Sequence, residues 1–581
     1  MRKYRNIRVG VAATLAGGLL AAYAGAASAE PGPTPSTFKQ VTFKAQDVAV
    51  DKLTTATNMT KDNDAPARAF TSPTSMLVKP DDPRVIVAAT AEQRGRQCYL
   101  TVSKDAGRTW HFSKELPTDP AYPFCTTNQV AGVPLTMLAW GSNDTLYYAH
   151  EAYGDVGGER PEGIREGRTS IVLARTTNLG ETWQTTLVDN QRGSTATPPA
   201  ADDGVTGLAV DTSGSKDVVY VGFTQRFPDA AMDSPLRLPH VMVATSTDGG
   251  VTFEKPVDLN TFQRPTLDAA GKTYPIYMMA SFGAPYLVAH DGVLLAVAGS
   301  TFGFNDQPAP PPEAGTGLNP GSWYAYPMPQ LIARSTDQGK TWTINKLSEP
   351  VFMGQGAFTG LGWTPDGGDN GSFVAVYAAT PQTAPSMNLE DIVMQRSTDG
   401  GITWSTMLAI DDDTPEMNAS GFYPQLNVAP DGRVDVAWQD VRERTTTDFY
   451  FDVRYTYSTD GGQTWAPNVK VNDLPLNFNY GISFNSDLRY PNGVASTDEY
   501  ALIGWADTRN ANELSQAQDS YAAGVQFAPL PTTKNTAAPI IAAIFGGLAV
   551  AGVVLLIVLL MRRGSAGTTT APTKAGAKVT T

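Results

Sequence analysis

Carboxylate and arginine side chains stand close together at several points of this sequence and could bind a charged ligand. The segments WQDVR and WADTR place Asp440 two residues before Arg442, and Asp507 two residues before Arg509. A guanidinium is planar and permanently charged, so it can hold a carboxylate through two parallel hydrogen bonds. If the fold brings such side chains together, they could clamp an acidic ligand. Related groups elsewhere are Glu92 with Arg94, His150 with Glu151, and Gln225 with Arg226.

The elements that must position these residues are marked by a repeated octapeptide. STDGGITW, which starts at Ser397, recurs as SKDAGRTW, TTNLGETW, STDGGVTF, STDQGKTW and STDGGQTW. Its polar side chains can hydrogen-bond turn amides, its glycine permits a positive φ, and its final ring can cover the base of a hairpin. Runs typical of half-buried strands, such as TSIVLAR and DIVMQR, precede the copies. Because catalysis does not need six copies of one group, we interpret the third residue of each copy as structural: Asp105, Asn178, Asp248, Asp337, Asp399 and Asp460.

The octapeptide resembles the Asp-box, or BNR repeat, of the sialidase-like β-propellers. In that family the box joins the third and fourth strands of a blade and lies on the face away from the active site. The resemblance therefore implies an all-β fold, a propeller of four-stranded antiparallel blades over residues 38–527. A seventh unit follows the last box without a fourth strand, and the segment Phe38–Val50 could supply that strand. We therefore expect seven blades, and six, as in the sialidases, is the alternative.

The same resemblance implies a site on the face opposite the boxes. Sialidases hold the carboxylate of their substrate with three arginines, and they use a tyrosine as nucleophile and an aspartate as acid and base. Tyr423, or alternatively Tyr480, is the candidate nucleophile, and Asp440 and Asp507 are the candidate acid/base residues. The Arg-Ile-Pro motif of that family has no counterpart, since the nearest early arginine, Arg68, stands in APARAF. The candidates for the carboxylate clamp are Arg94, Arg226, Arg442 and Arg509.

Other interpretations fit the same residues. WQDVR and WADTR could be a repeated strand end, in which the tryptophan packs between blades and the aspartate pairs with the arginine. An exo-α-sialidase-type glycosidase is one expected function, and a non-catalytic receptor for glycans or proteins, or an envelope scaffold, is the alternative. A glycan or surface glycoconjugate is the expected partner. The 57 acidic and 43 basic residues give a net charge of −14, which argues against nucleic acid as a partner.

No cofactor is expected, and no recognised metal motif is found. Acidic turns at Asp411–Asp413 and Asp366–Gly371 could hold calcium, but neither has the spacing of an EF-hand loop, so no metal site is predicted. The two cysteines, Cys98 and Cys125, can oxidise outside the cell to a disulfide that closes a loop of about 28 residues. Two buried thiols are the alternative.

Both ends of the chain predict export and membrane anchoring. A positively charged start, an apolar run and a small-residue cleavage site predict a signal peptide at 1–29. Residues 540–561 are apolar and uncharged and precede two arginines, which predicts a single membrane-spanning helix, a cytoplasmic tail at 562–581 and an extracellular ectodomain at the cell membrane. The stretch LPTTK just before this helix resembles a sortase signal, but lysine stands where that signal has glycine. Linkers are expected at 30–37 and 528–539.

Overall fold

The computed structural model describes the chain from Phe38 to Phe527. Within these limits the description excludes residues 93, 95–96, 115, 117–124, 126–135, 154–168, 191–200, 228–239, 270, 280–285, 304–325, 353–358, 369, 382–389, 414–420, 443–449, 478–479 and 482–492. The predicted signal peptide, both predicted linkers, the predicted membrane helix at 540–561 and the tail lie outside the described residues. Among the residues that are described, no helix has the length and apolar character needed to cross a membrane.

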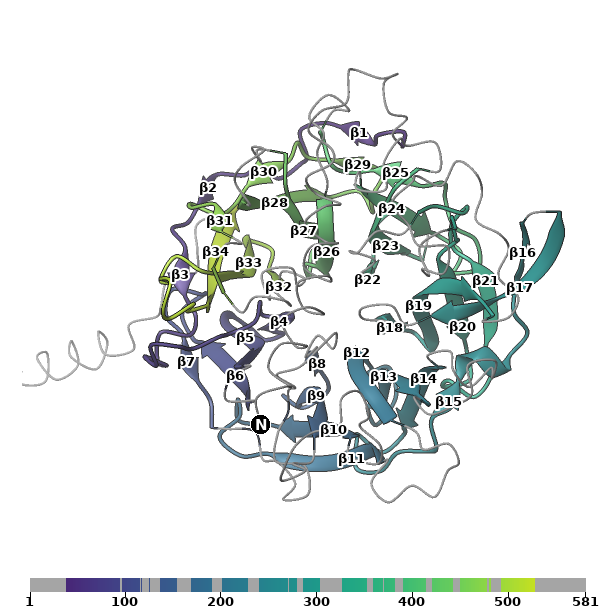
Figure 1. Ribbon diagram of the computed structural model, residues 1–581, viewed down its shortest axis with the longest axis horizontal. Helices are drawn as coiled ribbons and strands as arrows, with labels where there is room; N and C mark the ends of the chain where they lie inside the picture. Colours follow the sequence, from purple (N-terminus) through teal and green to yellow (C-terminus); the bar gives the residue numbers. More distant parts are fainter. Residues whose placement is uncertain are drawn as a thin grey trace, which may run out of the picture. The chain divides into compact units, whose positions relative to one another are not determined.

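Short strands and tight turns build seven four-stranded antiparallel sheets, which are arranged as the blades of a ring (Figure 1). The middle strands of a blade are packed on both faces by neighbouring blades, so most of their residues are buried. In β23 (Ser372–Ala379), for example, every residue is buried. The innermost strand of each blade contacts that of the next, and β32 of the last blade contacts β4 of the first, so the ring is closed. The expected seven blades are confirmed.

Blades 1 to 3 follow one another in the first half of the chain, each from its innermost strand outward. Blade 1 consists of β4 (Ser75–Lys79), β5 (Asp82–Glu92), β6 (Gln97–Ser103) and β7 (His111–Phe112). Blade 2 consists of β8 (Met137–Trp140), β9 (Leu146–Tyr153), β10 (Thr169–Thr176) and β11 (Gln184–Asn190). Blade 3 consists of β12 (Ala201–Asp211), β13 (Val218–Arg226), β14 (His240–Ser246) and β15 (Val257–Asp258), and the short 3₁₀ helix η3 (Leu259–Thr261) follows it.

Blades 4 to 7 use the same order with small additions. Blade 4 consists of β18 (Tyr286–His290), β19 (Val293–Phe302), β20 (Leu331–Ser335) and β21 (Thr343–Lys346), and the hairpin of β16 (Thr266–Ala269) and β17 (Lys272–Met279) pairs with β19. Blade 5 consists of β22 (Thr359–Thr364), β23, β24 (Asp391–Ser397) and β25 (Leu408–Ala409). Blade 6 consists of β26 (Gly421–Val428), β27 (Val434–Asp440), β28 (Tyr450–Ser458) and β30 (Val469–Lys470), and β31 (Leu476–Asn477) also pairs with β28. Blade 7 contains β32 (Gly493–Ser496), β33 (Tyr500–Asp507) and β34 (Asp519–Gln526).

The fourth strand of blade 7 comes from the beginning of the propeller. β2 (Lys52–Leu53) and β3 (Thr57–Asn58) pair antiparallel with β34, the last strand of the chain. The two ends of the propeller sequence therefore share one sheet, and this sheet latches the ring shut. Figure 1 shows β2 and β3 lying along the outside of the last blade.

The segment Phe38–Val50, which the sequence offered as this strand, has a different place. It runs along the outer edges of blades 5 and 6, where β1 (Thr42–Phe43) pairs in parallel with β29 (Thr464–Trp465). The alternating pattern of the segment is used here, because Val41 is buried in the core between these blades and its amide donates to the carbonyl of Ala409 at 2.9 Å. The expectation was therefore right about an outer edge strand but assigned it to the wrong blade.

Each Asp-box forms the turn after the third strand of a blade, as the resemblance implied. In STDGGITW the Ser397 hydroxyl donates to Asp399 at 2.7 Å and accepts the amide hydrogen of Gly401 at 2.9 Å. The hydroxyl of Thr403 donates to the other oxygen of Asp399 at 2.5 Å, and the indole of Trp404 donates to the Gly401 carbonyl at 3.3 Å. The polar side chains of the box thus hold its own turn. The same pattern recurs around Asp105, Asn178, Asp248, Asp337 and Asp460.

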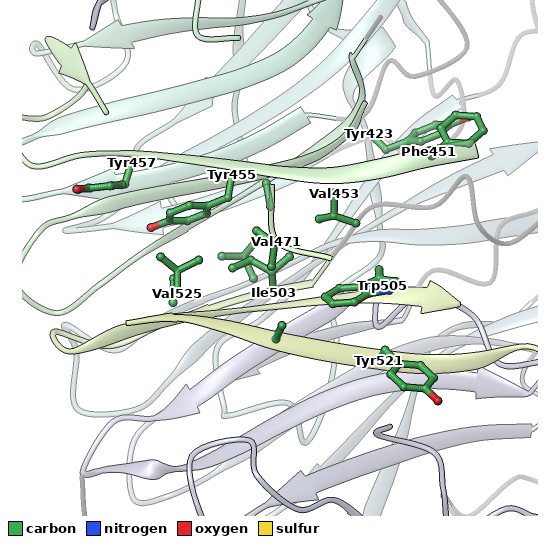
Figure 2. Close-up of a cluster of buried hydrophobic side chains, with 14 of the residues drawn as sticks. Tyr423, Phe451, Val453, Tyr455, Tyr457, Val471, Ile503, Trp505, Tyr521 and Val525 are labelled. Carbon is green, nitrogen blue, oxygen red and sulfur yellow. The ribbon is translucent and has the colours of Figure 1, made fainter. Parts of the chain in front are cut away.

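The hydrophobic core is divided into clusters that lie between neighbouring blades. Figure 2 shows the cluster between blades 6 and 7, in which Trp505 and Tyr455 are fully buried. Trp438 has the corresponding place in the cluster between blades 5 and 6. Burial of a side chain of this size stabilises the fold by roughly 1.5–3 kcal/mol, so the contacts between blades hold the ring together.

Cys98 and Cys125 form a disulfide, with their Cα atoms 5.8 Å apart. Both side chains lie in the cluster between blades 1 and 2, where Leu100 and Tyr148 are also buried. Because Cys98 belongs to β6, the bond ties the loop that leaves blade 1 to the third strand of that blade.

Candidate functional site

The residues expected to form a site lie on the face opposite the Asp-boxes. The second strand of each blade runs away from the box face, since neighbouring strands are antiparallel. Its last residues therefore end on the opposite face, over blades 1, 3, 6 and 7. Glu92 ends β5, Arg226 ends β13, Asp440 ends β27 and Asp507 ends β33.

The segment WQDVR forms a closed group of hydrogen bonds at the end of β27. The indole of Trp438 donates to Asp440 at 3.1 Å, and the backbone amide of Arg442 donates to the same carboxylate at 2.8 Å. The Arg442 guanidinium donates to Asp440 through Nε at 3.0 Å and through Nη2 at 2.9 Å. Its remaining nitrogen, Nη1, donates to Asp412 at 2.5 Å, in the link from blade 5 to blade 6. Asp440 is only 2% exposed.

The segment WADTR repeats this arrangement in blade 7. Trp505 donates to Asp507 at 3.0 Å, and Arg509 donates to it from the backbone and from Nη2, both at 2.7 Å. Arg509 also pairs with Asp473 at 2.8 Å, in the link from blade 6 to blade 7, and its guanidinium lies 4.2 Å from the ring centre of Tyr521. We call the two groups, residues 438–442 and 505–509, the Trp-Asp-Arg corners. This geometry agrees with the interpretation of these segments as a repeated strand end, in which the aspartate pairs with the arginine.

The corners leave little positive charge for a ligand. Burial alone would lower the pKa of Arg442, but its hydrogen bonds to Asp440 and Asp412 and the nearby negative charges together outweigh burial and raise the pKa. The same balance, with Asp507 and Asp473 as partners, raises the pKa of Arg509. Each guanidinium is thus held between two carboxylates, one in its own corner and one in the preceding link.

Two other predicted residues hold the chain that enters blade 1. The carboxylate of Glu92 accepts the amide hydrogen of Ala69 at 2.7 Å. The Arg94 guanidinium donates to backbone carbonyls, those of Ala67 and, at 3.0 Å, Ser515. Arg94 is therefore bound to the backbone of blade 7 and of the entering segment. The side chain of Arg226 lies outside the described part of the structure.

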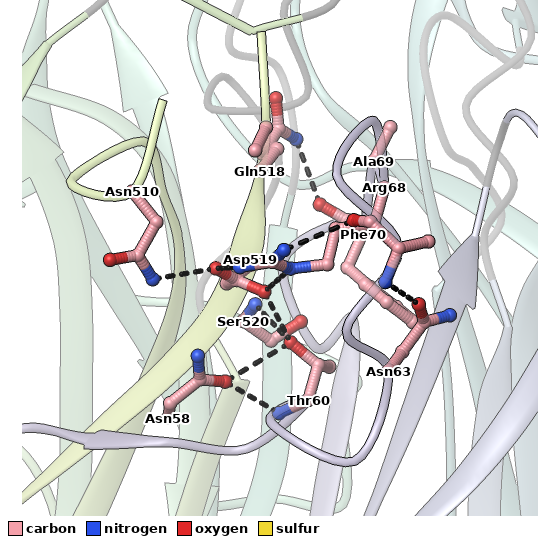
Figure 3. Close-up of polar contacts among 12 residues, drawn as sticks. Asn58, Thr60, Asn63, Arg68, Ala69, Phe70, Asn510, Gln518, Asp519 and Ser520 are labelled. Carbon is pink, nitrogen blue, oxygen red and sulfur yellow. Dashed lines mark hydrogen bonds and ion pairs between the residues drawn. The ribbon is translucent and has the colours of Figure 1, made fainter. Parts of the chain in front are cut away.

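Arg68, the early arginine without the sialidase motif, fastens the same segment to blade 7 (Figure 3). Its Nε and Nη2 donate to the two oxygens of Asp519 at 2.5 and 2.7 Å. Asn510 donates to the same carboxylate at 2.8 Å, and Gln518 donates to the carbonyl of Phe70 at 2.8 Å. Asp519 is fully buried, so this network is a polar latch beside the paired strands β2, β3 and β34.

The candidate nucleophile Tyr423 has an unusual backbone. It lies on β26 with a φ of 55°, where the pairing of β26 with β27 is interrupted between Phe422 and Gln425. A bulky residue rarely adopts a positive φ, and such bulges often re-aim a side chain next to a functional site. The Tyr423 side chain is buried, with its ring 6.2 Å from that of Phe422. Tyr480, the alternative nucleophile, is half-buried in the link that follows blade 6.

His150 and Glu151 lie within β9 and are both buried. Burial lowers the pKa of His150 to about 4, so the ring is neutral at pH 7. Its Nδ1 lies 3.0 Å from the carbonyl oxygen of Glu151, which fits a proton on that nitrogen. Gln225, at the end of β13, donates to Asp189 of blade 2 at 3.3 Å. The Gln225 hydrogen bond therefore joins blade 3 to blade 2.

An acidic cluster that the sequence identified only in part lies at the outer edge of blade 5 on this face. Asp391 is the first residue of β24, and Asp411 and Asp413 follow β25. One carboxylate oxygen of each lies within 4.8 Å of the other two. Burial raises the pKa of Asp391 to about 6. Burial and repulsion by Asp391 raise the pKa of Asp413 to about 7. Burial and repulsion by Asp413 raise the pKa of Asp411. The turn Asp411–Asp413 is visible in the sequence, but its proximity to Asp391 is not.

A pocket of about 400 Å³ lies away from these residues. It is lined by the latch segment near Thr54, by the Asp-box turn at Gly107 and Arg108, and by Tyr500 and Leu502 of blade 7. No predicted site residue lines it, and it opens beside a box turn rather than on the opposite face.

Comparisons with known proteins agree with the repeat. The family model of the BNR/Asp-box repeat matches residues 395–406 and 456–467. A search of curated protein sequences found no match. A protein of unknown function from Dyadobacter fermentans DSM 18053 has a solved structure that is 15% identical, with 71% of this chain and 96% of that chain covered and a TM-score of 0.40.

Two enzymes are among the other solved structures that match. The α-L-arabinofuranosidase Arb93A from Fusarium graminearum is 14% identical, with 70% of this chain and 93% of that chain covered and a TM-score of 0.36. The Trypanosoma rangeli sialidase is 13% identical, with 68% and 55% covered and a TM-score of 0.37. Likeness at this level supports no conclusion about activity. The repeat matches and the sheet topology lead to one assignment: the chain is a seven-bladed β-propeller built from Asp-box repeats.

Proposed function

We propose that this chain is a carbohydrate-binding propeller of the cell surface, which holds a neutral glycan on the face opposite the Asp-boxes. The observation that supports this proposal best is the pairing of Arg442 and Arg509, each with two carboxylates. A sialic-acid clamp needs arginines whose charge is available to the ligand. Both corner arginines are neutralised before any ligand arrives.

The energetics of the corners favour a neutral ligand. Freeing Arg442 for an acidic sugar would leave Asp440 buried with only the longer ion pair to Arg454 at 3.9 Å, and breaking a buried pair costs about 3–5 kcal/mol. A hydrogen bond to a charged group contributes about 1.5–3 kcal/mol, so one new bond to the sugar would not offset that cost. The net charge of −14 also repels an acidic ligand. A neutral glycan avoids both penalties.

The face opposite the boxes has features that suit a sugar. Tyr450, the first residue of β28, is 37% exposed there, and an aromatic ring can stack on the apolar face of a sugar. The chain segments that join β13 to β14 and β19 to β20 also begin and end on this face. Long connections on a rigid scaffold often carry binding residues.

Glycoside hydrolysis of the exo-α-sialidase type is the second candidate, and Tyr423 favours it. A strained residue on a bulged strand is the kind of feature that concentrates at functional sites. A tyrosine is also the nucleophile that the sialidase resemblance implies. This mechanism would need clamp arginines other than Arg442 and Arg509, of which Arg94 and Arg226 are the sequence candidates.

Two assays on the purified full chain separate these functions. The first measures binding to immobilised neutral and sialylated glycans, and the second measures release of free sialic acid. We expect binding to neutral glycans that Tyr450→Ala weakens at least tenfold, whereas Ile402→Ala, at an exposed position of a box turn, leaves it unchanged. Release of sialic acid that Tyr423→Phe abolishes would replace the binding proposal with the second candidate. Neither binding nor release would contradict both.

The surface location rests on the predicted signal peptide and on the predicted helix at 540–561. We place the propeller outside the cell, with the tail at 562–581 inside. Protease added to intact cells should then remove the propeller, and a propeller that is protected until the cells are lysed would contradict this placement.

A further inference from the structure

Blades 5, 6 and 7 each bury an aspartate at the same position of the third strand. Asp391, Asp452 and Asp519 lie directly opposite the last residue of the second strand of their blades. These three aspartates are 7%, 5% and 0% exposed, respectively. A buried carboxylate is costly unless a donor or a cation compensates its charge. The three blades can therefore be compared for what compensates it.

In blades 6 and 7 a positively charged side chain compensates the aspartate. In blade 6 the ammonium of Lys470 pairs with Asp452 at 2.7 Å, and the amide of Asn472 donates to the same carboxylate at 2.9 Å. In blade 7 the guanidinium of Arg68 binds both oxygens of Asp519. Each of these aspartates thus has at least one cationic partner within hydrogen-bond distance.

Blade 5 has carboxylates where blade 6 has donors. The Ile392 amide donates to Asp411 at 2.8 Å, just as the Val453 amide donates to Asn472 at 2.7 Å, so Asp411 occupies the position of Asn472. Strand pairing likewise aligns Ala409 of blade 5 with the lysine of blade 6. Blade 5 therefore has the carboxylate of Asp411 where blade 6 has the amide of Asn472, and the methyl group of Ala409 where blade 6 has the ammonium of Lys470. The carboxylate of Asp413 lies near the other two of blade 5.

The charge of this cluster is not met by the side chains around it. Asp411 is fully buried, and its Oδ1 has no hydrogen-bond partner. Asp391 accepts only a backbone amide hydrogen, that of Phe38 at 3.3 Å, among the contacts that the described residues show. The charge of Arg442 lowers the pKa of Asp413, but the hydrogen bonds of Arg442 go to Asp440 and Asp412.

We propose that Asp391, Asp411 and Asp413 bind a divalent metal cation, with calcium as the preferred ion. An all-carboxylate set of ligands suits a hard cation rather than zinc or copper. The three oxygens all lie within 4.8 Å of one another, so one ion can contact all three. Calcium accepts roughly six to eight oxygen ligands, whereas magnesium usually keeps several waters and is bound through only one or two protein carboxylates, so three carboxylates favour calcium. The unpartnered oxygen of Asp411 would then be a ligand.

The ion would also fix the N-terminal strap, which we define as Phe38–Val50. The side-chain amide of Gln40 donates to the backbone carbonyls of Asp411 and Asp413 at 3.2 and 3.0 Å. The amide of Phe38 reaches Asp391, as described above. A cation that orders the three carboxylates therefore orders the acceptors that hold the strap on blade 5.

The test uses the purified full chain, freed of metal with EDTA and then titrated with CaCl₂, MgCl₂ or MnCl₂. We expect one calcium ion per chain in equilibrium dialysis, a Tm that rises with calcium until the site is filled, and weaker binding of magnesium. A second readout is tryptic cleavage at the exposed Lys39 and Lys44 of the strap, which calcium should slow at least several-fold.

Asp411→Asn is the informative variant because it recreates the amide that blade 6 carries. It should fold, lose stoichiometric calcium binding, and melt at the same temperature with calcium or with EDTA. Asp366→Asn is the matched control, since Asp366 is also an acidic residue near other carboxylates, Asp431 and Asp460, but belongs to a different group; it should keep the calcium response. The proposal is wrong if the wild-type chain binds no calcium stoichiometrically, or if Asp411→Asn and Asp413→Asn both retain the calcium-dependent rise in Tm.

Discussion

Replacing Arg442 by alanine should destabilise the propeller by about 3–5 kcal/mol, because a buried carboxylate loses the cation that hydrogen-bonds it and keeps only the ion pair with Arg454 at 3.9 Å. The side chain of Arg442 is 8% exposed and that of Asp440 is 1% exposed, so water cannot replace the lost hydrogen bonds. The other partner, Asp412, is 29% exposed and can be hydrated in part. Most of the loss should therefore arise at Asp440.

Arg509→Ala is the comparison that tests this reasoning. Arg509 donates to Asp507 through one guanidinium nitrogen, whereas Arg442 donates to its aspartate through two. The second partner, Asp473, is 41% exposed. We therefore expect a smaller loss for Arg509→Ala, about 2–3 kcal/mol.

Thermal unfolding followed by tryptophan fluorescence measures both variants. With an unfolding entropy of about 2.1 cal/mol/K per residue over about 490 residues, 1 kcal/mol corresponds to about 1 °C in Tm if the ring unfolds as a unit. Arg442→Ala should thus lower Tm by about 3–5 °C. If Tm does not change and the variant instead loses binding to a sialylated glycan, the corner is a ligand clamp and the structural interpretation is refuted.

The remaining predictions concern one Asp-box and the latch. Hydrogen bonds from Thr341 lower the pKa of Asp337 to about 2, so this carboxylate stabilises the fold above about pH 4 and loses that effect as the pH falls toward 2. Urea unfolding should therefore show that Asp337→Asn is less stable than wild type at pH 7. An equal loss of stability near pH 2 would contradict the ionic origin of the effect. Arg68→Ala removes the cation beside the buried Asp519, so it should destabilise the propeller by about 3 kcal/mol and hasten tryptic cleavage at Lys52. Unchanged cleavage would show that β2 and β3 stay paired with β34 without Arg68.

The sequence was sufficient for the scaffold because the scaffold is local and repeated. The Asp-box around Asp399 is satisfied by atoms within a few residues, so its pattern predicts its geometry wherever it occurs. The strand pairs before each box follow the same logic, and the structure confirms seven blades. The placement of Phe38–Val50 was wrong because several blades offer an outer edge, and alternation alone cannot select among them.

The candidate site was harder to predict because its partners are distant in the sequence. The segment WQDVR reveals that Asp440 and Arg442 are neighbours, but not that Asp412 of the previous link completes the neutralisation. The acidic cluster is similar, since Asp391 meets Asp411 only when two strands of one blade are paired. Comparing each blade with the next, position by position, is the signal that would have found it.

The shared sheet of blade 7 has a consequence for how the chain is made. Thr54 donates to and accepts from a strand residue, Gly524, that lies 470 residues further along, so the ring cannot close until the last strand has been synthesised. Contacts of such long range form late and slowly. Until then, the chain is an open arc with unpaired strand edges at both ends, a species prone to aggregate. Truncation before β34 should therefore destabilise the whole ring and not blade 7 alone, since the ring can no longer close.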